Sequence, residues 1–162
     1  VGIRVIALCL GGQMLSRPLG GTVTRNPVKE IGWVPVAAED NAPAREWLGG
    51  RAGFTTFEWH EDTFTIPPGG TRILTGEDCG NQAYVVGDRH LGMQYHMEIT
   101  AEMLETWCRT GISDIDQNVG LSPAVQDAAT ILSLVPANLA PLTAVANGLY
   151  ARWVRNLRAA AP

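Results

Sequence analysis

Ile3 to Arg17 reads IRVIALCLGGQMLSR, and this stretch decides the expected fold class. Residues 3–8 form a short apolar run with β-branched side chains, which is typical of a buried strand in a parallel sheet. A glycine-bearing turn follows at residues 9–12, and residues 13–17 favour a short helix that Pro18 should end or kink. This order of strand, tight turn and helix predicts an α/β domain.

Cys9 stands at the turn between the predicted strand and helix. A side chain at such a turn is directed into a cleft, and the neighbouring glycines permit a tight backbone and close approach of a substrate. The helix N-terminus favours the thiolate, and the N–H of Leu10 can face a developing oxyanion. The alternative is an inert buried cysteine that closes a strand. The sequence Gly11-Gly12-Gln13 after it favours the nucleophile.

A second pattern, Gly92-Met93-Gln94-Tyr95-His96-Met97-Glu98, predicts a strand over residues 92–97. Residues two apart on a strand point to the same face, so the imidazole of His96 should meet the carboxylate of Glu98. This is the base and the orienting acid of a catalytic triad. Taken alone, a histidine with an acid two residues away is a weak signal. Its weight comes from Cys9, because the members of such triads are typically far apart in sequence.

The rest of the chain alternates between strand and helix patterns. Strands are expected at residues 22–25, 30–36, 54–60, 72–74 and 82–86. Helices are expected at residues 42–48, 100–108, 123–134 and 139–157, with a break near Pro136. The apolar residues Leu149, Trp153 and Leu157 recur every four residues, so one face of the last helix should pack on the domain.

Composition excludes several classes of function. The sequence is 46% hydrophobic and 17% charged, which is typical of a globular protein. Its 162 residues are enough for one domain. The net charge is −4 without a Lys/Arg block, so no nucleic-acid partner is expected. The sequence contains no run of eighteen apolar residues, so no membrane span is predicted. Three widely spaced cysteines argue against disulfides and a CxxC metal site, and favour a reducing cytoplasm.

Five blocks together resemble the class I, or triad-type, glutamine amidotransferases, and most of all stand-alone proteins similar to the amidotransferase domain of GMP synthase. They cover about residues 3–110 and occur in the family's order: LCLGGQML (8–15), NPVKEIGWVPV (26–36), WHEDTF (59–64), CGNQAY (79–84) and GMQYHMEIT (92–100).

This resemblance implies a three-layer, flavodoxin-like α/β sheet with residues 1–110 as the amidotransferase-like part and residues 111–162 as a helical appendage. It makes Cys9 the nucleophile, His96 the general base and acid, and Glu98 the third member. It assigns Gly11 and Gln13 to the substrate pocket and Leu10 to the oxyanion. The implied reaction is hydrolysis of glutamine, or of a γ-glutamyl amide, to glutamate and ammonia through a thioester. No metal or organic cofactor is implied, and a separate synthetase would receive the ammonia.

The sequence departs from the family at its N-terminus. The βα units that normally precede the nucleophile strand, and the glycine loop that supplies a second oxyanion donor, are not found before Cys9. The nucleophile strand should therefore have an exposed apolar edge, which predicts oligomerisation or poor solubility of these residues alone. Ala7 stands where the family often has Gly, Met97 where many members have Pro, and Glu61 where Gly is common.

Other residues have competing interpretations. His60 either lines the pocket or is a structural core group, and His90 is expected in a solvated turn. Cys79 and Cys108 are expected to be packing residues, and Asp114 and Asp116 to lie in a loop without metal-site spacing. Two other functions compete with glutamine hydrolysis: a γ-glutamyl peptide hydrolase without an ammonia acceptor, and a non-catalytic binding protein on the same scaffold.

Overall fold

A computed structural model describes the backbone of residues 3–159 and the side chains of residues 3–155. The strands are β1 (Val5–Leu8), β2 (Val23–Ala38), β3 (Gly53–Phe64), β4 (Gly70–Gly76), β5 (Ala83–Val86) and β6 (His90–Met93). The helices are α1 (Leu10–Ser16), α2 (Ala42–Leu48), α3 (Ala101–Thr110), α4 (Ile112–Asn118), α5 (Ala128–Ser133) and α6 (Val135–Ala159), with a short 3-10 turn at Arg17–Leu19.

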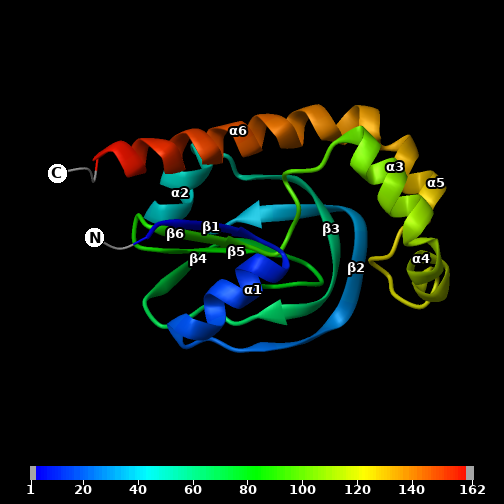
Figure 1. Ribbon diagram of the computed structural model, residues 1–162, viewed down its shortest axis with the longest axis horizontal. Coiled ribbons are helices and arrows are strands. Elements are labelled where there is room, and N and C mark those ends of the chain that lie inside the picture. Colours follow the sequence, from blue (N-terminus) through cyan, green and yellow to red (C-terminus); the bar gives the residue numbers. More distant parts are fainter. Residues whose placement is uncertain (1–2, 160–162) are drawn as a thin grey trace.

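The six strands form one mixed sheet in the order β1-β6-β5-β4-β2-β3. Only β1 and β6 are parallel, and the other neighbours are antiparallel. The sheet curls, so that the long strands β2 and β3 arch around from the short strands β1, β5 and β6 (Figure 1). The α/β prediction is confirmed, and β1 occupies one end of the sheet as the sequence suggested.

Cross-strand register separates the two faces of β2 and β3. Ile31 pairs with Trp59 and Trp33 with Phe57, and these apolar side chains belong to the core that the helices cover. Alternate positions point to the other face, where Glu30 is opposite His60. The side chains of Glu30 and His60 therefore lie on the opposite face of β2 and β3 from those of Trp33 and Phe57.

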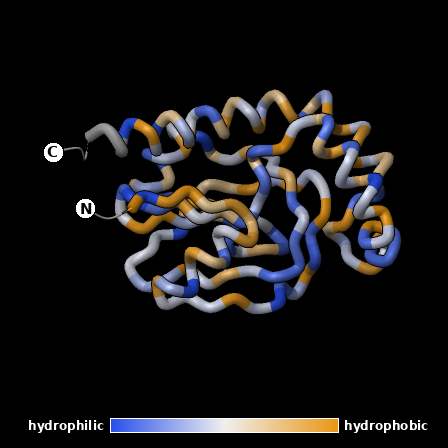
Figure 2. Tube along the Cα trace, in the orientation of Figure 1, coloured by the Kyte–Doolittle hydropathy of each residue, from blue (hydrophilic) through white to orange (hydrophobic). Residues whose placement is uncertain are grey.

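The long helix α6 lies along one side of the molecule, with α2 between it and the sheet and with α3, α4 and α5 gathered near its start (Figure 1). Leu142 and Leu149 on α6 are buried in the same cluster as Trp33 and Phe57. Hydrophobic residues recur along α6, between hydrophilic ones (Figure 2). The expected packing of Leu149 is confirmed, and the side chain of Leu157 lies outside the described residues. The division of the chain at residue 110 stays a prediction.

Several element boundaries differ from the sequence expectations. The strands expected at residues 22–25 and 30–36 are parts of the single strand β2, which begins at Val23, because Asn26 and Pro27 only shift its register with β3. The helix expected from residue 123 begins at Ala128, where Asp127 rather than Ser122 caps it by accepting from the N–H of Thr130. The last helix begins at Val135 and continues through Pro141 without a break.

Two further corrections concern residues near the candidate site. The strand expected at residues 92–97 is β6, which spans residues 90–93, so His90 opens a strand instead of lying in a turn. Residues 112–118 form α4, which places Asp114 in a helix rather than a loop. The helix expected at residues 100–108 is confirmed, with Thr100 as its N-cap.

Candidate active site

Cys9 occupies a strained turn between β1 and α1. Its backbone has φ 45° and ψ −112°, and it is the only residue other than glycine with positive φ in the described part of the chain. Such a conformation costs about 1–3 kcal/mol and persists where the surrounding structure imposes it. Leu10 is the first residue of α1, so its N–H has no acceptor within the helix. The predicted strand-to-helix turn is thus present, with the thiol of Cys9 at a helix N-terminus.

Close packing holds α1 against the sheet. A Cβ atom on Gly12 would lie 2.4 Å from the carbonyl oxygen of Met93, so only glycine fits there. The hydroxyl of Tyr84 donates to the carbonyl of Gly12 at 3.0 Å. Gly11 has room for a side chain, since its nearest neighbour would be the Ala7 Cβ at 3.5 Å. Gly12, rather than Gly11, is therefore the glycine on which the position of the nucleophile depends.

Gln13 ties α1 to the far end of β3. Its side-chain nitrogen donates to the carbonyl of Asp62 at 2.9 Å and lies 3.4 Å from Oε1 of Gln94. The Gln13 side chain is buried and its nitrogen is occupied by protein partners in this arrangement. A contact of Gln13 with substrate stays a prediction.

His96 and Glu98 lie just beyond β6 and form the expected pair. Nδ1 of His96 is 2.7 Å from Oε1 of Glu98, and the His96 N–H donates to the carbonyl of Phe57 at 2.9 Å. This isolated bridge between His96 and Phe57 of β3, rather than a continuous strand, keeps the side chains of His96 and Glu98 on the same side of the backbone. Cys9 is close enough to influence the pKa of the His96 ring.

The free edge of β3 brings the two halves of the site together. The carbonyl oxygen of Trp59 lies 3.9 Å from the sulfur of Cys9. Two residues earlier on the same strand, the carbonyl of Phe57 accepts a hydrogen bond from the backbone N–H of His96. Nε2 of Gln94 lies 3.7 Å from the same sulfur. The site therefore sits at the seam where β3, at one end of the curled sheet, meets the segments that follow β1 and β6.

The environment of His96 favours the imidazolium. Burial by itself lowers the pKa of His96, but the hydrogen bonds and negative charges of Cys9 and Glu98 outweigh it and raise the pKa to about 10. The charge of Glu98, after burial, also raises the pKa of Tyr150, so α6 reaches the edge of the triad. An imidazolium beside a thiolate is the activated form of a cysteine nucleophile.

His60 lies in a second, buried cluster. Its Nε2 is 2.7 Å from Oε2 of Glu30 and 3.4 Å from Oε2 of Glu58, and its Nδ1 is 3.0 Å from the carbonyl of Asp62. Glu30 and Glu58 are fully buried. Burial and then the charge of Glu30 raise the pKa of Glu58 well above its ordinary value. The structural interpretation of His60 accounts for both of its nitrogens, and a direct contact with substrate stays a prediction.

Cys79 brings a thiol near this cluster. Its sulfur, an oxygen of Glu30 and a nitrogen of His60 lie within 4.8 Å of one another, and these are donor types that zinc accepts. The nitrogen of His60 that faces Glu30 is already in a direct hydrogen bond, and burial raises the pKa of Cys79 to about 11. Metal ligands must be deprotonated, so the arrangement fits a hydrogen-bonded core cluster better than a metal site.

Sequence reasoning missed the aromatic wall beside His96. The rings of His96 and Trp107 stand edge to face with centroids 4.9 Å apart, and those of Trp107 and Trp59 with centroids 6.1 Å apart. Nε1 of Trp59 donates to Asp114 at 3.0 Å, and Asp114 is also paired with Lys29. Sequence alone favours core packing for Trp59 and Trp107, and only the contact between β3 and α3 shows that they adjoin the triad.

Known proteins share this fold and much of this sequence. The glutamine amidotransferase-like protein YfeJ of Salmonella typhimurium is 35% identical over 103 residues, which are 62% of this chain and 43% of that protein. One component of the glutamine-hydrolysing GMP synthase of Sulfurisphaera tokodaii is 35% identical over 96 residues, which are 58% of this chain and 50% of that component. The chain is therefore similar in sequence to glutamine amidotransferases.

Solved structures agree with this kinship. The glutamine amidotransferase of Methylobacillus flagellatus has a TM-score of 0.88 and 43% identity over 94% of this chain and 62% of its own. That of Thermotoga maritima has a TM-score of 0.78 and 30% identity over 92% of this chain and 61% of its own. No protein-family model matches the chain. The chain spans about half the length of the curated relatives named above.

The amidotransferase relationship fits the flavodoxin-like α/β fold. None of the helices in the described residues is long and apolar enough to cross a lipid bilayer.

Proposed function

We propose that this chain hydrolyses the side-chain amide of glutamine, or of a γ-glutamyl amide, through a thioester on Cys9. The observation that carries the proposal is that β3 brings together the thiol of a strained strand-to-helix turn, at the Trp59 carbonyl, and His96, at the Phe57 carbonyl. Nδ1 of His96 is in turn 2.7 Å from Glu98. The named activity of the GMP synthase relatives, glutamine hydrolysis, supports the same reaction class.

Each residue has a chemical role in this mechanism. The Cys9 thiolate attacks the amide carbon, and the N–H of Leu10 stabilises the oxyanion. The His96 imidazolium then protonates the departing nitrogen, so that ammonia leaves and a γ-glutamyl thioester remains. His96 next removes a proton from water, which cleaves the thioester to glutamate and free thiol. Glu98 fixes the ring of His96 and stabilises its positive charge.

The test is covalent labelling with a glutamine-mimicking electrophile, 6-diazo-5-oxonorleucine. Mass spectrometry of the labelled protein should place one adduct on Cys9, and Cys9→Ser should abolish both the adduct and glutamate release from glutamine. Cys108→Ser is the matched control, because Cys108 is buried in the hydrophobic core and should leave both readouts intact. A wild-type protein without an adduct and without glutamate release would favour a non-catalytic binding role.

We further propose that the released ammonia passes to a separate synthetase, since relatives of this chain include one component of a GMP synthase. Adding such a synthetase should allow glutamine to replace ammonium as its nitrogen source, and Cys9→Ser should remove that ability. A synthetase that continues to require free ammonium in the presence of the wild-type chain would contradict the coupling.

A further inference from the structure

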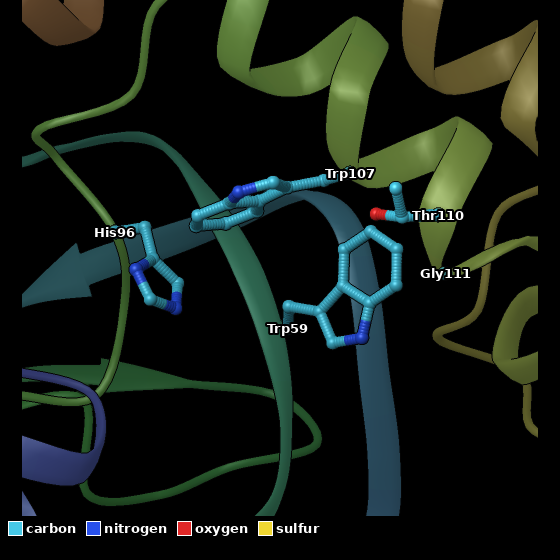
Figure 3. A pocket seen from close by; sticks show the side chains of 5 residues that line it. All are labelled: Trp59, His96, Trp107, Thr110 and Gly111. Atoms are coloured by element: carbon cyan, nitrogen blue, oxygen red, sulfur yellow. The ribbon is translucent and has the colours of Figure 1, made fainter.

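A cavity of about 370 Å³ opens beside the catalytic imidazole (Figure 3). Its lining comes from β3, the segment after β6, and the end of α3: Trp59, His96, Trp107, Thr110 and Gly111. This volume is within the range of roughly 300–1,000 Å³ that small-molecule sites occupy. Ammonia, the leaving group from glutamine, is about the size of one water molecule and needs none of this space.

The geometry fixes which part of a substrate would enter this cavity. His96 has to protonate the departing nitrogen, so that nitrogen must lie next to the imidazole when the carbonyl carbon is at the Cys9 sulfur. The ring of His96 is also a wall of the cavity, and the backbone of Trp59, another wall residue, contacts Cys9 at 3.9 Å. A substituent on the departing nitrogen is therefore directed into the cavity.

The walls are chemically suited to an uncharged flat or bulky apolar group. Two polar groups of the walls already have partners: the indole N–H of Trp59 donates to Asp114, and the hydroxyl of Thr110 donates to the carbonyl of Thr106. What remains facing the space is largely the carbon of two indole rings that stand edge to face. Aromatic side chains favour a further ring in an edge-to-face or offset arrangement.

We propose that this cavity is a leaving-group subsite and that the chain prefers γ-glutamyl amides of aromatic or bulky apolar amines over those of small amines. This rests on the proposed function, because the same Cys9 and His96 perform the reaction. The sulfur–carbon bond forms as the carbon–nitrogen bond breaks, and the proton of His96 goes to the nitrogen of the departing amine. Water then releases glutamate and restores the thiol.

The experiment compares two substrates, γ-L-glutamyl benzylamide and γ-L-glutamyl methylamide. Benzylamine is the less basic leaving amine, so the cavity-filling variants below, in which this intrinsic difference cancels, decide the test. The ratio of their kcat/KM values should favour the benzylamide by at least about tenfold, which is the effect expected for burying a phenyl group. Thr110→Trp should fill the cavity and lower this ratio at least about fivefold. Thr110 is exposed and bonds only its own helix, so the urea-unfolding midpoint should confirm that the variant folds.

Thr143→Trp is the matched control. Thr143 is likewise exposed, and its hydroxyl likewise donates to the carbonyl four residues earlier, but it lies on α6 and does not line this cavity. The control should leave the substrate ratio unchanged. Thr110→Phe provides a second cavity-filling variant with a smaller ring, and it should lower the ratio in the same direction.

The outcomes separate this inference from the proposed function. Turnover of glutamine and methylamide without any benzylamide advantage would overturn the subsite and leave the proposed function standing. A Thr110→Trp variant that keeps the ratio but loses coupling to a synthetase would also overturn it, and would assign the cavity to a partner side chain. No turnover of any substrate, together with no adduct on Cys9, would overturn both.

Discussion

Two histidine–glutamate pairs of this molecule have the same distance between ring nitrogen and carboxylate oxygen but differ in their surroundings. His96 contacts Glu98 at 2.7 Å, and His60 contacts Glu30 at 2.7 Å. The side chains of the first pair are 14% and 31% exposed, whereas those of the second are 1% and 0% exposed. The first pair adjoins a thiol and a cavity, and the second lies inside the curl of the sheet.

The difference lies in what the second ring nitrogen is free to do. Nδ1 of His96 is held by Glu98, and the charge of Cys9 acts on the same ring. Both nitrogens of His60 are held, one by Glu30 and one by the carbonyl of Asp62. A bond between histidine and a carboxylate therefore does not identify a catalytic base, because catalysis also needs a nitrogen that can exchange its proton with a reacting group.

The largest expected effect separates the two histidines by activity. His96→Asn should lower kcat/KM for glutamine by roughly 10²–10⁴-fold, because it removes proton transfer at both steps. Its urea-unfolding midpoint should change little. Glutamate release and unfolding measured on the same preparation check both statements, and a His96→Asn variant of near-normal activity would show that the pair near the thiol is not the catalytic one.

The converse substitution should act on stability. His60→Ala removes the partner that two buried carboxyl groups share, and breaking such a buried pair costs about 3–5 kcal/mol. Urea unfolding, followed by tryptophan fluorescence, measures this loss. Unchanged stability together with lost activity would instead assign His60 a catalytic role rather than a structural one.

A smaller effect should appear in the pH dependence of the exposed pair. Because the pKa of His96 is raised to about 10, the imidazolium that protonates the leaving group persists at neutral pH and is lost as pH rises through about 10. Glu98→Gln removes one of the negative charges that raise this pKa. The alkaline limb of the kcat/KM profile should therefore move to lower pH in that variant, and a limb that stays in place would argue against Glu98 as the orienting acid.

The smallest expected effect is on the pH dependence of stability, and it comes from Glu58, which lies beside His60 in the buried cluster. Its pKa is raised in the folded state, so the folded protein holds a proton that the unfolded chain releases as pH passes the ordinary glutamate pKa of about 4.3. Stability from this group is highest below that pH and falls as pH rises. Glu58→Gln is a neutral mimic, so it should reduce this fall in stability between pH 5 and pH 8. An equal loss of unfolding free energy between pH 5 and pH 8 in the wild type and in Glu58→Gln would contradict this prediction.

The sequence predicted the first pair because its signals are local. Cys9 is followed closely by a glycine pair and a helix, and His96 and Glu98 are two residues apart. Their joining depends on the order of strands, which the family resemblance supplied. The strand assigned to His96 was too long, but the bridge to Phe57 preserved the alternation on which the prediction relied.

The second pair and the aromatic wall depend on register, which a single sequence does not contain. Glu58 and His60 share a face by alternation, and this signal was available, but Glu30 meets His60 only because β2 pairs with β3 in one particular register. Trp107 reaches His96 through the docking of α3. Helix α4 was missed because Ser113, Asp114 and Asp116 resemble a polar loop, while its buried Ile115 was overlooked.

The backbone angle of Cys9 has a consequence for evolution and for engineering. Glycine would adopt that angle without the cost that any β-carbon brings, so Cys9→Gly should make the protein harder to unfold while leaving it without a nucleophile. Selection for heat resistance alone would therefore tend to replace this cysteine, and selection for a function of its thiol would be needed to keep it.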